Sequence, residues 1–193
     1  MKNVIFILGF IFLVNSFNCF SNTIEKNGNE YKSKRKYVYG YSEDFKEEFF
    51  LGVSFEKVIK PADTIYSIRL QLHASEIEGR KNICFNKANS VTFLSKNGKT
   101  VDIQISDVKS LVDHNDKTDH LYSTINESHY STIVILNVSK EQLIEVGSEP
   151  FYHIILPYLD CKSKVAKKAE FIKPTLMVSR RFIQKNVKYI LDI

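Results

Sequence analysis

The feature that most constrains the fold is a strict alternation of apolar and polar residues over 64–75, TIYSIRLQLHAS. The apolar series is Tyr66, Ile68, Leu70, Leu72 and Ala74, and the polar series is Ser67, Arg69, Gln71, His73 and Ser75. Successive side chains of a β-strand point to opposite faces of a sheet. The alternation therefore predicts an antiparallel sheet with one buried face and one wet face.

Other segments have the same strand character and bring the expected number of strands to six to eight. Gly52 is a candidate bulge within 47–59, and Asn97-Gly98 is typical of a hairpin turn. The polar segment 107–120 is predicted to be a loop, and 162–173 fits either a basic edge strand or a helix. The further candidate strands are 37–41, 47–59, 90–106, 121–126, 130–139 and 151–159.

Two helices are expected beside the strands. Ser139 and Gln142 have the spacing of a capping box, which predicts a short helix over 140–146 that Gly147 ends. Apolar residues recur at helical spacing within 175–191, which predicts a C-terminal helix with its basic residues mostly outward. The sequence thus predicts an all-β fold, an antiparallel β-sandwich with one short helix and a C-terminal helix.

The first 21 residues have the pattern of a signal peptide. Lys2 is followed by an apolar run from Val4 to Val14. That run is long enough for a secretory h-region and too short for a spanning helix. Small residues before Asn22 suit cleavage, whereas lipidation of Cys19 and an uncleaved anchor are the two alternatives. We therefore expect export to the periplasm or the medium, or, if Cys19 is acylated, attachment to the cell envelope.

The remainder of the chain is predicted to be one domain. Residues 22–36 have little hydrophobic patterning and are expected to form a flexible basic arm. Residues 37–193 have the length of a single domain, and 44% of the whole chain is hydrophobic. A sandwich with the C-terminal helix over 175–191 accounts for this part.

The cysteines predict one disulfide. If Cys19 leaves with the leader, Cys84 and Cys161 remain, and two cysteines in an exported chain favour a bridge, with two buried thiols as the alternative. Their separation resembles the inter-sheet bridge of immunoglobulin domains. However, the chain has no Trp, and Tyr158 lies three residues before Cys161 rather than two. The resemblance therefore implies an immunoglobulin-like architecture in general terms and no membership of that family.

A cluster of carboxylates and imidazoles in 113–120 is the first candidate site. Oxygen ligands suit calcium and histidines suit zinc, so the cluster is a candidate divalent-metal site. The spacing matches no established metal-binding loop, and a solvated acidic loop is the alternative interpretation. No cofactor is predicted from any motif. The candidate ligands are Asp113, His114, Asp116, Asp119 and His120.

A basic and aromatic stretch, 31–41, is the second candidate site. Cations beside tyrosines on one strand face suit a polyanion or a carbohydrate, although tyrosine is also a common strand residue that packs against neighbours. The candidate residues are Lys34, Arg35, Lys36, Tyr37, Tyr39 and Tyr41.

The charge distribution suggests a third surface. Residues 162–193 hold nine Lys or Arg against two Asp or Glu, while the rest of the mature chain is mildly acidic. This basic C-terminal segment is expected to make at most weak contact with anionic surfaces. No specific nucleic-acid binding is expected.

Function is expected to rest on binding, because no catalytic motif is present. The sequence lacks a serine elbow, Cys-x-x-Cys, His-Glu-x-x-His and a glycine-rich phosphate loop. The hypothesis is an exported binding or accessory protein whose partner is a protein or an envelope polymer. The alternatives are a secreted hydrolase with a site assembled from distant residues and a periplasmic inhibitor or immunity-type protein.

Overall fold

The computed structural model describes residues 24–42, 47–74, 83–113, 129–160, 163–174 and 181–193. Within these ranges the chain forms twelve strands and two helices. The strands are β1 (Ile24–Asn27), β2 (Glu30–Ser33), β3 (Lys36–Ser42), β4 (Glu47–Ile59), β5 (Thr64–Ala74), β6 (Ile83–Cys84), β7 (Ser90–Ser95), β8 (Thr100–Gln104), β9 (Asp107–Asp113), β10 (His129–Val138), β11 (Phe151–Asp160) and β12 (Ala166–Pro174). The helices are α2 (Lys140–Gly147) and α3 (Phe182–Asp192).

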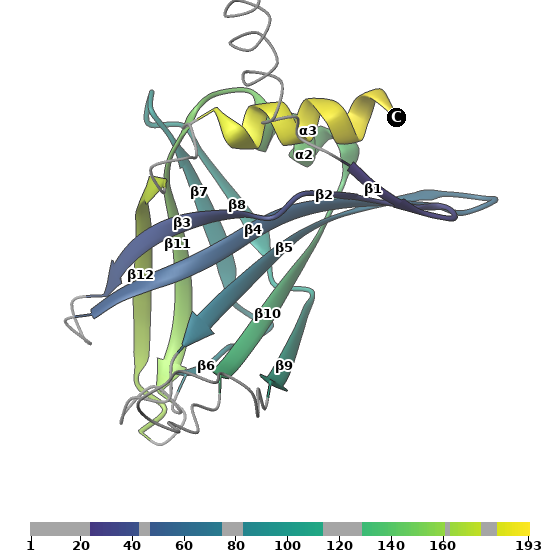
Figure 1. Cartoon of the computed structure of the whole chain (residues 1–193). Helices are drawn as coiled ribbons and strands as arrows, with labels where there is room; N and C mark the ends of the chain where they lie inside the picture. The colour runs from purple at the N-terminus through teal and green to yellow at the C-terminus, as the bar shows by residue number, and fades with distance from the viewer. Residues whose placement is uncertain (1–23, 43–46, 75–82, 114–128, 161–162, 175–180) are drawn as a thin grey trace, which may run out of the picture.

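The strands form one antiparallel sheet that folds over into two layers (Figure 1). The strand order is β8-β7-β11-β12-β3-β4-β5-β10-β9, with β1 beside β2, β2 beside β4, and β6 beside β11. One layer contains β7, β8, β11 and β12, and the other contains β3, β4, β5, β9 and β10. The sheet is not closed, and the fold is the sandwich-like all-β architecture that the sequence predicts.

The chain passes from one edge of this sheet directly to the other edge. β8 ends at Gln104 and β9 begins at Asp107, so only Ile105 and Ser106 separate two strands that belong to different layers. The Ser106 N–H donates to the Ile135 carbonyl (2.9 Å), and the Ser106 hydroxyl accepts from the Asn137 N–H (2.8 Å). Strands that switch sheets in this way form the corners of sandwiches. The loop predicted over 107–120 is therefore wrong for its first seven residues, which pair with β10 as β9.

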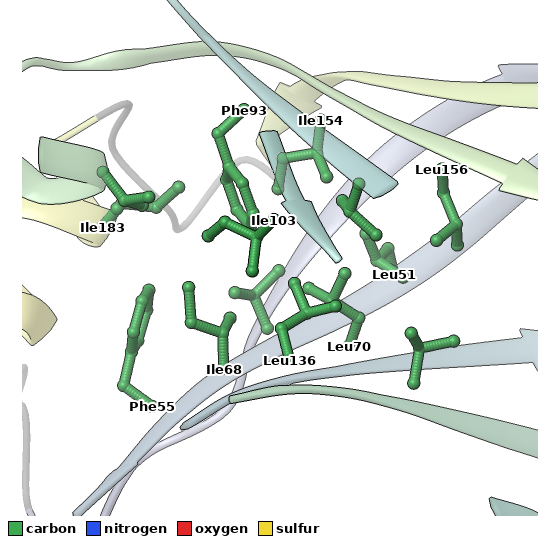
Figure 2. Packing of buried hydrophobic residues seen from close by; sticks show 14 of the residues in the cluster. Leu51, Phe55, Ile68, Leu70, Phe93, Ile103, Leu136, Ile154, Leu156 and Ile183 are labelled. Atoms are coloured by element: carbon green, nitrogen blue, oxygen red, sulfur yellow. The ribbon is translucent and has the colours of Figure 1, made fainter. Parts of the chain in front are cut away.

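Apolar side chains from both layers meet in a single core (Figure 2). The apolar face predicted for β5 is confirmed, because Tyr66, Ile68, Leu70 and Leu72 are all buried on one face. The other face is less wet than predicted, because Ser67 and Gln71 are also buried. Figure 2 shows Leu51, Phe55, Ile68, Leu70 and Leu136 of one layer facing Phe93, Ile103, Ile154 and Leu156 of the other, with Ile183 of α3 at one end.

Both predicted helices are present, and they pack against each other over one end of the sandwich (Figure 1). The Ser139 hydroxyl accepts from the Gln142 N–H (3.1 Å), and the Gln142 side chain accepts from the Ser139 N–H (3.0 Å), so the capping box is confirmed. Of the helix expected over 175–191, the structure describes α3 from Phe182 onward, and residues 175–180 lie outside the described ranges. A Cβ on Gly147 would lie 2.6 Å from Val187, so glycine permits the close approach of the two helices.

One buried polar group interrupts the apolar face of α3. Asn186 is fully buried among the core residues of this helix. Within the described part of the chain, neither its amide oxygen nor its amide nitrogen has a hydrogen-bond partner. An unsatisfied buried amide costs about 1–3 kcal/mol, so α3 is held more weakly than its apolar residues alone would allow.

Two further expectations need correction. The flexible arm predicted over 22–36 is wrong for Ile24–Asn27 and Glu30–Ser33, which pair as the hairpin β1–β2. The ambiguous segment 162–173 contains β12, and β12 lies between β11 and β3 in the middle of the sheet rather than at an edge. Its alternation explains this position, because Ala169 and Phe171 are buried while Lys168 is exposed.

Candidate functional site on the projecting ribbon

Four strands extend beyond the sandwich as a ribbon, which we define as β1, β2, residues 54–59 of β4 and residues 64–69 of β5. The ribbon projects to the right in Figure 1, below α3. α3 contacts β2 and β4. Because side chains alternate along each strand, the ribbon has an inner face, continuous with the core, and an outer face.

The ribbon begins where β4 changes partners. β4 pairs with β3 as far as Val53 and with β2 from Glu56 onward. Between these points the Phe55 N–H would lack an acceptor, and the buried hydroxyl of Ser33 accepts from it at 2.9 Å. Because buried backbone donors are nearly always paired, this bond explains a serine in an otherwise apolar environment.

Gly52 of β4 lies beside the break between β2 and β3. Gly52 is the cross-strand partner of Tyr37, and a Cβ on Gly52 would lie 2.5 Å from Cδ of Arg35 and 3.2 Å from Cε1 of Tyr37. The Arg35 stem and the Tyr37 ring therefore lie across Gly52 on the outer face. The expected bulge at Gly52 does not occur, since the β4 register with β3 is continuous there. Instead, Gly52 permits the side chains of Arg35 and Tyr37 to approach the β4 backbone closely.

The inner face carries a row of alternating cations and aromatic rings. Lys26 is the cross-strand partner of Tyr31, Tyr31 of Lys57, and Lys57 of Tyr66. The ammonium of Lys26 lies 5.4 Å from the centre of the Tyr31 ring, and that of Lys57 lies 5.8 Å from the centre of the Tyr66 ring. Lys57 is only 7% exposed. The ring of Tyr66 thus stabilises a cation that is largely removed from water.

The outer face contains a hollow of about 330 Å³, which we call the outer hollow. This volume lies at the lower limit of small-molecule pockets. Val58 contributes apolar surface, and Tyr31, whose ring lies on the inner face, also borders the hollow. Most of the lining residues are polar. The polar walls are Glu25 and Asn27 of β1, Glu30 and Lys32 of β2, Glu56 of β4 and Arg69 of β5.

Within the described ranges, one of the three carboxylates in the outer hollow is in ion pairs. Oε1 of Glu56 lies 2.8 Å from Nη1 of Arg69 and 3.3 Å from Nζ of Lys32. In the described part of the chain, no ion pair involves Glu25 or Glu30. The rim formed by β1 and β2 is therefore acidic, whereas the floor formed by β4 and β5 is electrically balanced.

The predicted basic and aromatic stretch 31–41 meets the outer hollow through Tyr31 and Lys32, and none of its six candidate residues is among the described residues that line the hollow. Lys34 is exposed and Arg35 lies on the outer face, both between β2 and β3, while Lys36 and Tyr37 begin β3. The register places Tyr37, Tyr39 and Tyr41 on one face of β3. The side chains of Tyr39 and Tyr41 lie outside the description. Binding of a polyanion or a carbohydrate by this surface stays a prediction.

The other predicted sites lie mainly outside the described residues. Asp113 is the last residue of β9, and His114, Asp116, Asp119 and His120 fall in the undescribed range 114–128. Within the described ranges, no three His, Cys, Asp or Glu side chains are grouped closely enough to hold a metal ion. Cys19 and Cys161 are also outside the described residues, and Cys84 is the last residue of β6.

The basic C-terminal segment keeps its predicted exposure where it is described. Arg181, Lys185 and Lys188 are exposed on α3. Weak contact of these residues with an anionic surface stays a prediction. Of the helices in the described ranges, none has the length and apolar character needed to cross a bilayer.

Comparison with known proteins gives no further guide. No protein-family model matches the chain, and no curated protein or solved structure is significantly similar to it.

The outer hollow was not predicted from the sequence, although two sequence signals indicate it. Arg69 was predicted on the polar face of its strand, and it lies on the outer face beside Glu56. Asn27-Gly28 is a hairpin signal of the same kind as Asn97-Gly98, and Gly28 adopts a φ of 58° in the turn between β1 and β2. Applying this signal to residues 24–33 would have replaced the arm by a hairpin and brought Glu25, Glu30 and Lys32 onto one surface.

Proposed function

We propose that the protein is an exported binding protein that acts through the outer hollow by interaction and not by catalysis. The observation that carries this proposal is the outer hollow itself, a concave surface on four paired strands. Rigid strands hold binding groups more accurately than loops do. A mixture of acidic, basic and aromatic side chains suits recognition of a polar partner.

Export is proposed from the leader, with cleavage before Asn22 as the main route and lipidation of Cys19 as the alternative.

We also propose the Cys84–Cys161 disulfide. β6 pairs with β11 so that Cys84 is the partner of Leu159. Cys161 follows Leu159 by two residues, which span at most about 7 Å of extended chain. This proximity supports the bridge and is consistent with an oxidising compartment.

Intact mass spectrometry of the protein from a secreting bacterial host tests export and the disulfide. A chain that begins at Asn22 and gains two hydrogens on reduction is the expected result. A chain that begins at Cys19 and carries the mass of acyl groups would instead support the alternative, a lipidated protein attached to the envelope. An unchanged mass on reduction would overturn the bridge.

Site-specific photo-crosslinking in the same host tests the binding site. A crosslinking residue in place of Asn27, which is exposed in the outer hollow, should give adducts of discrete mass. The matched control replaces Glu141, which is exposed on α2 and does not line the outer hollow. Adducts at neither position, or equal adducts at both, would overturn the outer hollow as the binding site.

A further inference from the structure

We propose that the partner is a polypeptide and that an extended, lysine-rich segment of it adds to β1 as a further strand of the ribbon. This inference rests on the proposed function, because it assigns a partner class to the outer hollow. Three observations carry it: the exposed edge of β1, the acidic rim, and the position of the rim relative to that edge.

β1 offers backbone groups for pairing. Among the described strands only β2 pairs with β1, and Glu25, Lys26 and Asn27 are exposed. The hairpin closes at the pair Asn27 and Glu30. In a two-residue hairpin this closing pair exchanges hydrogen bonds, and pairs alternate along the ladder. The N–H and C=O of Lys26 therefore point away from β2 and are placed to bond an added strand.

The charges beside this edge select a basic segment. An added strand would lie about 4.8 Å from β1, and its outward side chains would stand next to Glu25 and Asn27. Lys32, the cross-strand partner of Glu25, contacts Glu56 at 3.3 Å. Among the described residues no cation pairs with Glu25 or Glu30, and lysine side chains of the partner complement them.

Contacts within the protein hold the ribbon in place. On its inner face, Lys57 and Tyr66 fix β4 to β5, and α3 contacts β2 and β4. Addition of a strand at β1 therefore requires no rearrangement of the sandwich, which limits the ordering cost to the partner segment.

The test uses the exported protein and a fluorescent ten-residue peptide of alternating lysine and threonine, with binding followed by anisotropy. We expect saturable binding that weakens with salt. The double variant E25Q and E30Q should weaken binding roughly tenfold or more, because charge-assisted contacts are the stronger kind. The variant E141Q removes an exposed carboxylate from α2 and should bind like the parent. Equal binding by the double variant and the parent would overturn the charge argument.

Strand addition has its own test at Lys26. K26P removes the lysine side chain and one backbone N–H, which points to the open edge, where proline is tolerated. K26A removes the side chain alone and is the control. Roughly tenfold weaker binding by K26P, with near-parent binding by K26A, supports strand addition. Equal binding by K26P and K26A overturns it. If Asn27 crosslinks to a partner in the host while the peptide does not bind, the lysine-rich strand is wrong and the proposed function stands.

Discussion

The two faces of the ribbon are made by the same four strands and differ in what their charged residues contact. On the inner face, Lys57 is almost completely buried and lies over Tyr66. On the outer face, Glu56 contacts Lys32 and Arg69 beside a hollow, and the carboxylates of Glu25 and Glu30 have no ion pair within the described residues. One face therefore stabilises the ribbon, and the other retains groups for an external partner.

The difference between the inner and the outer face shows that alternating residues of one strand can serve stability on one face and binding on the other. Phe55 and Lys57 alternate with Glu56 along β4, so the outer face can change without repacking the core. We therefore expect substitutions on the inner face to change mainly the free energy of unfolding, and substitutions on the outer face to change mainly binding.

The largest effect is expected from Phe55→Ala, which removes a fully buried ring where the ribbon joins the sandwich. Its cost should be about 3–5 kcal/mol. Urea unfolding followed by circular dichroism measures it. Val58→Ala, at a half-buried position on the outer face, is the control and should cost much less. Equal costs for the two variants would remove the distinction between the faces.

Asn186→Leu should stabilise the protein, because it replaces an unsatisfied buried amide by an apolar side chain of similar volume. We expect a gain of about 1–2 kcal/mol. α3 contacts β2 and β4 but contributes no residue to the outer hollow. Peptide affinity should therefore not change. Thermal unfolding and anisotropy test both statements. A loss of stability would indicate that the Asn186 amide has a partner in solution.

A double-mutant cycle on Lys57 and Tyr66 measures the cation–aromatic contact. Lys57→Met keeps an unbranched apolar stem, and Tyr66→Leu keeps a buried apolar group. The coupling free energy from the two single variants and the double variant should be about 0.5–2 kcal/mol. If the two effects simply add, the row on the inner face is not an energetic unit.

Glu56→Gln tests the outer face and should cost about 1 kcal/mol or less, because partly exposed ion pairs contribute little. Glu30→Gln is the matched control and should be neutral, because Glu30 has no ion pair with any residue that the structure describes. The difference between them should shrink in 1 M salt as screening increases. A cost for Glu56→Gln as large as that for Phe55→Ala would contradict the division of roles.

The smallest effect is expected from the exposed pair of Asp107, on β9, and Lys87, between β6 and β7. A hydrogen bond from Lys87 (2.9 Å) lowers the pKa of Asp107 below its usual value of 3.8. Because the folded pKa is the lower one, this pair stabilises the fold above about pH 4 and the contribution is lost as the pH falls through the folded value. Lys87→Gln should flatten the acid side of the Tm profile slightly. An identical profile for the variant would show that the pair does not act in solution.

Local patterns predicted much of the fold. The alternation in β5 and the capping box at Ser139 are both confirmed, because each acts over a few residues. The sheet switch at Ile105–Ser106 could not be predicted in the same way, since pairing with β10 and not local propensity makes 107–113 a strand. The outer hollow was missed for a related reason, because Glu56 and Arg69 meet β1 and β2 only through strand pairing.

The position of β12 has a consequence for how the chain folds. β3 pairs on one side with β4, its neighbour in sequence, and on the other with β12, which comes near the end of the chain. The middle of the sheet therefore closes only after residues 166–174 are present, and such non-local pairing slows folding. If the chain crosses a membrane N-terminus first, one edge of β3 stays unpaired until β12 has also crossed. The basic residues Lys167 and Lys168 of β12 would then help to keep the late strand from aggregating before it inserts.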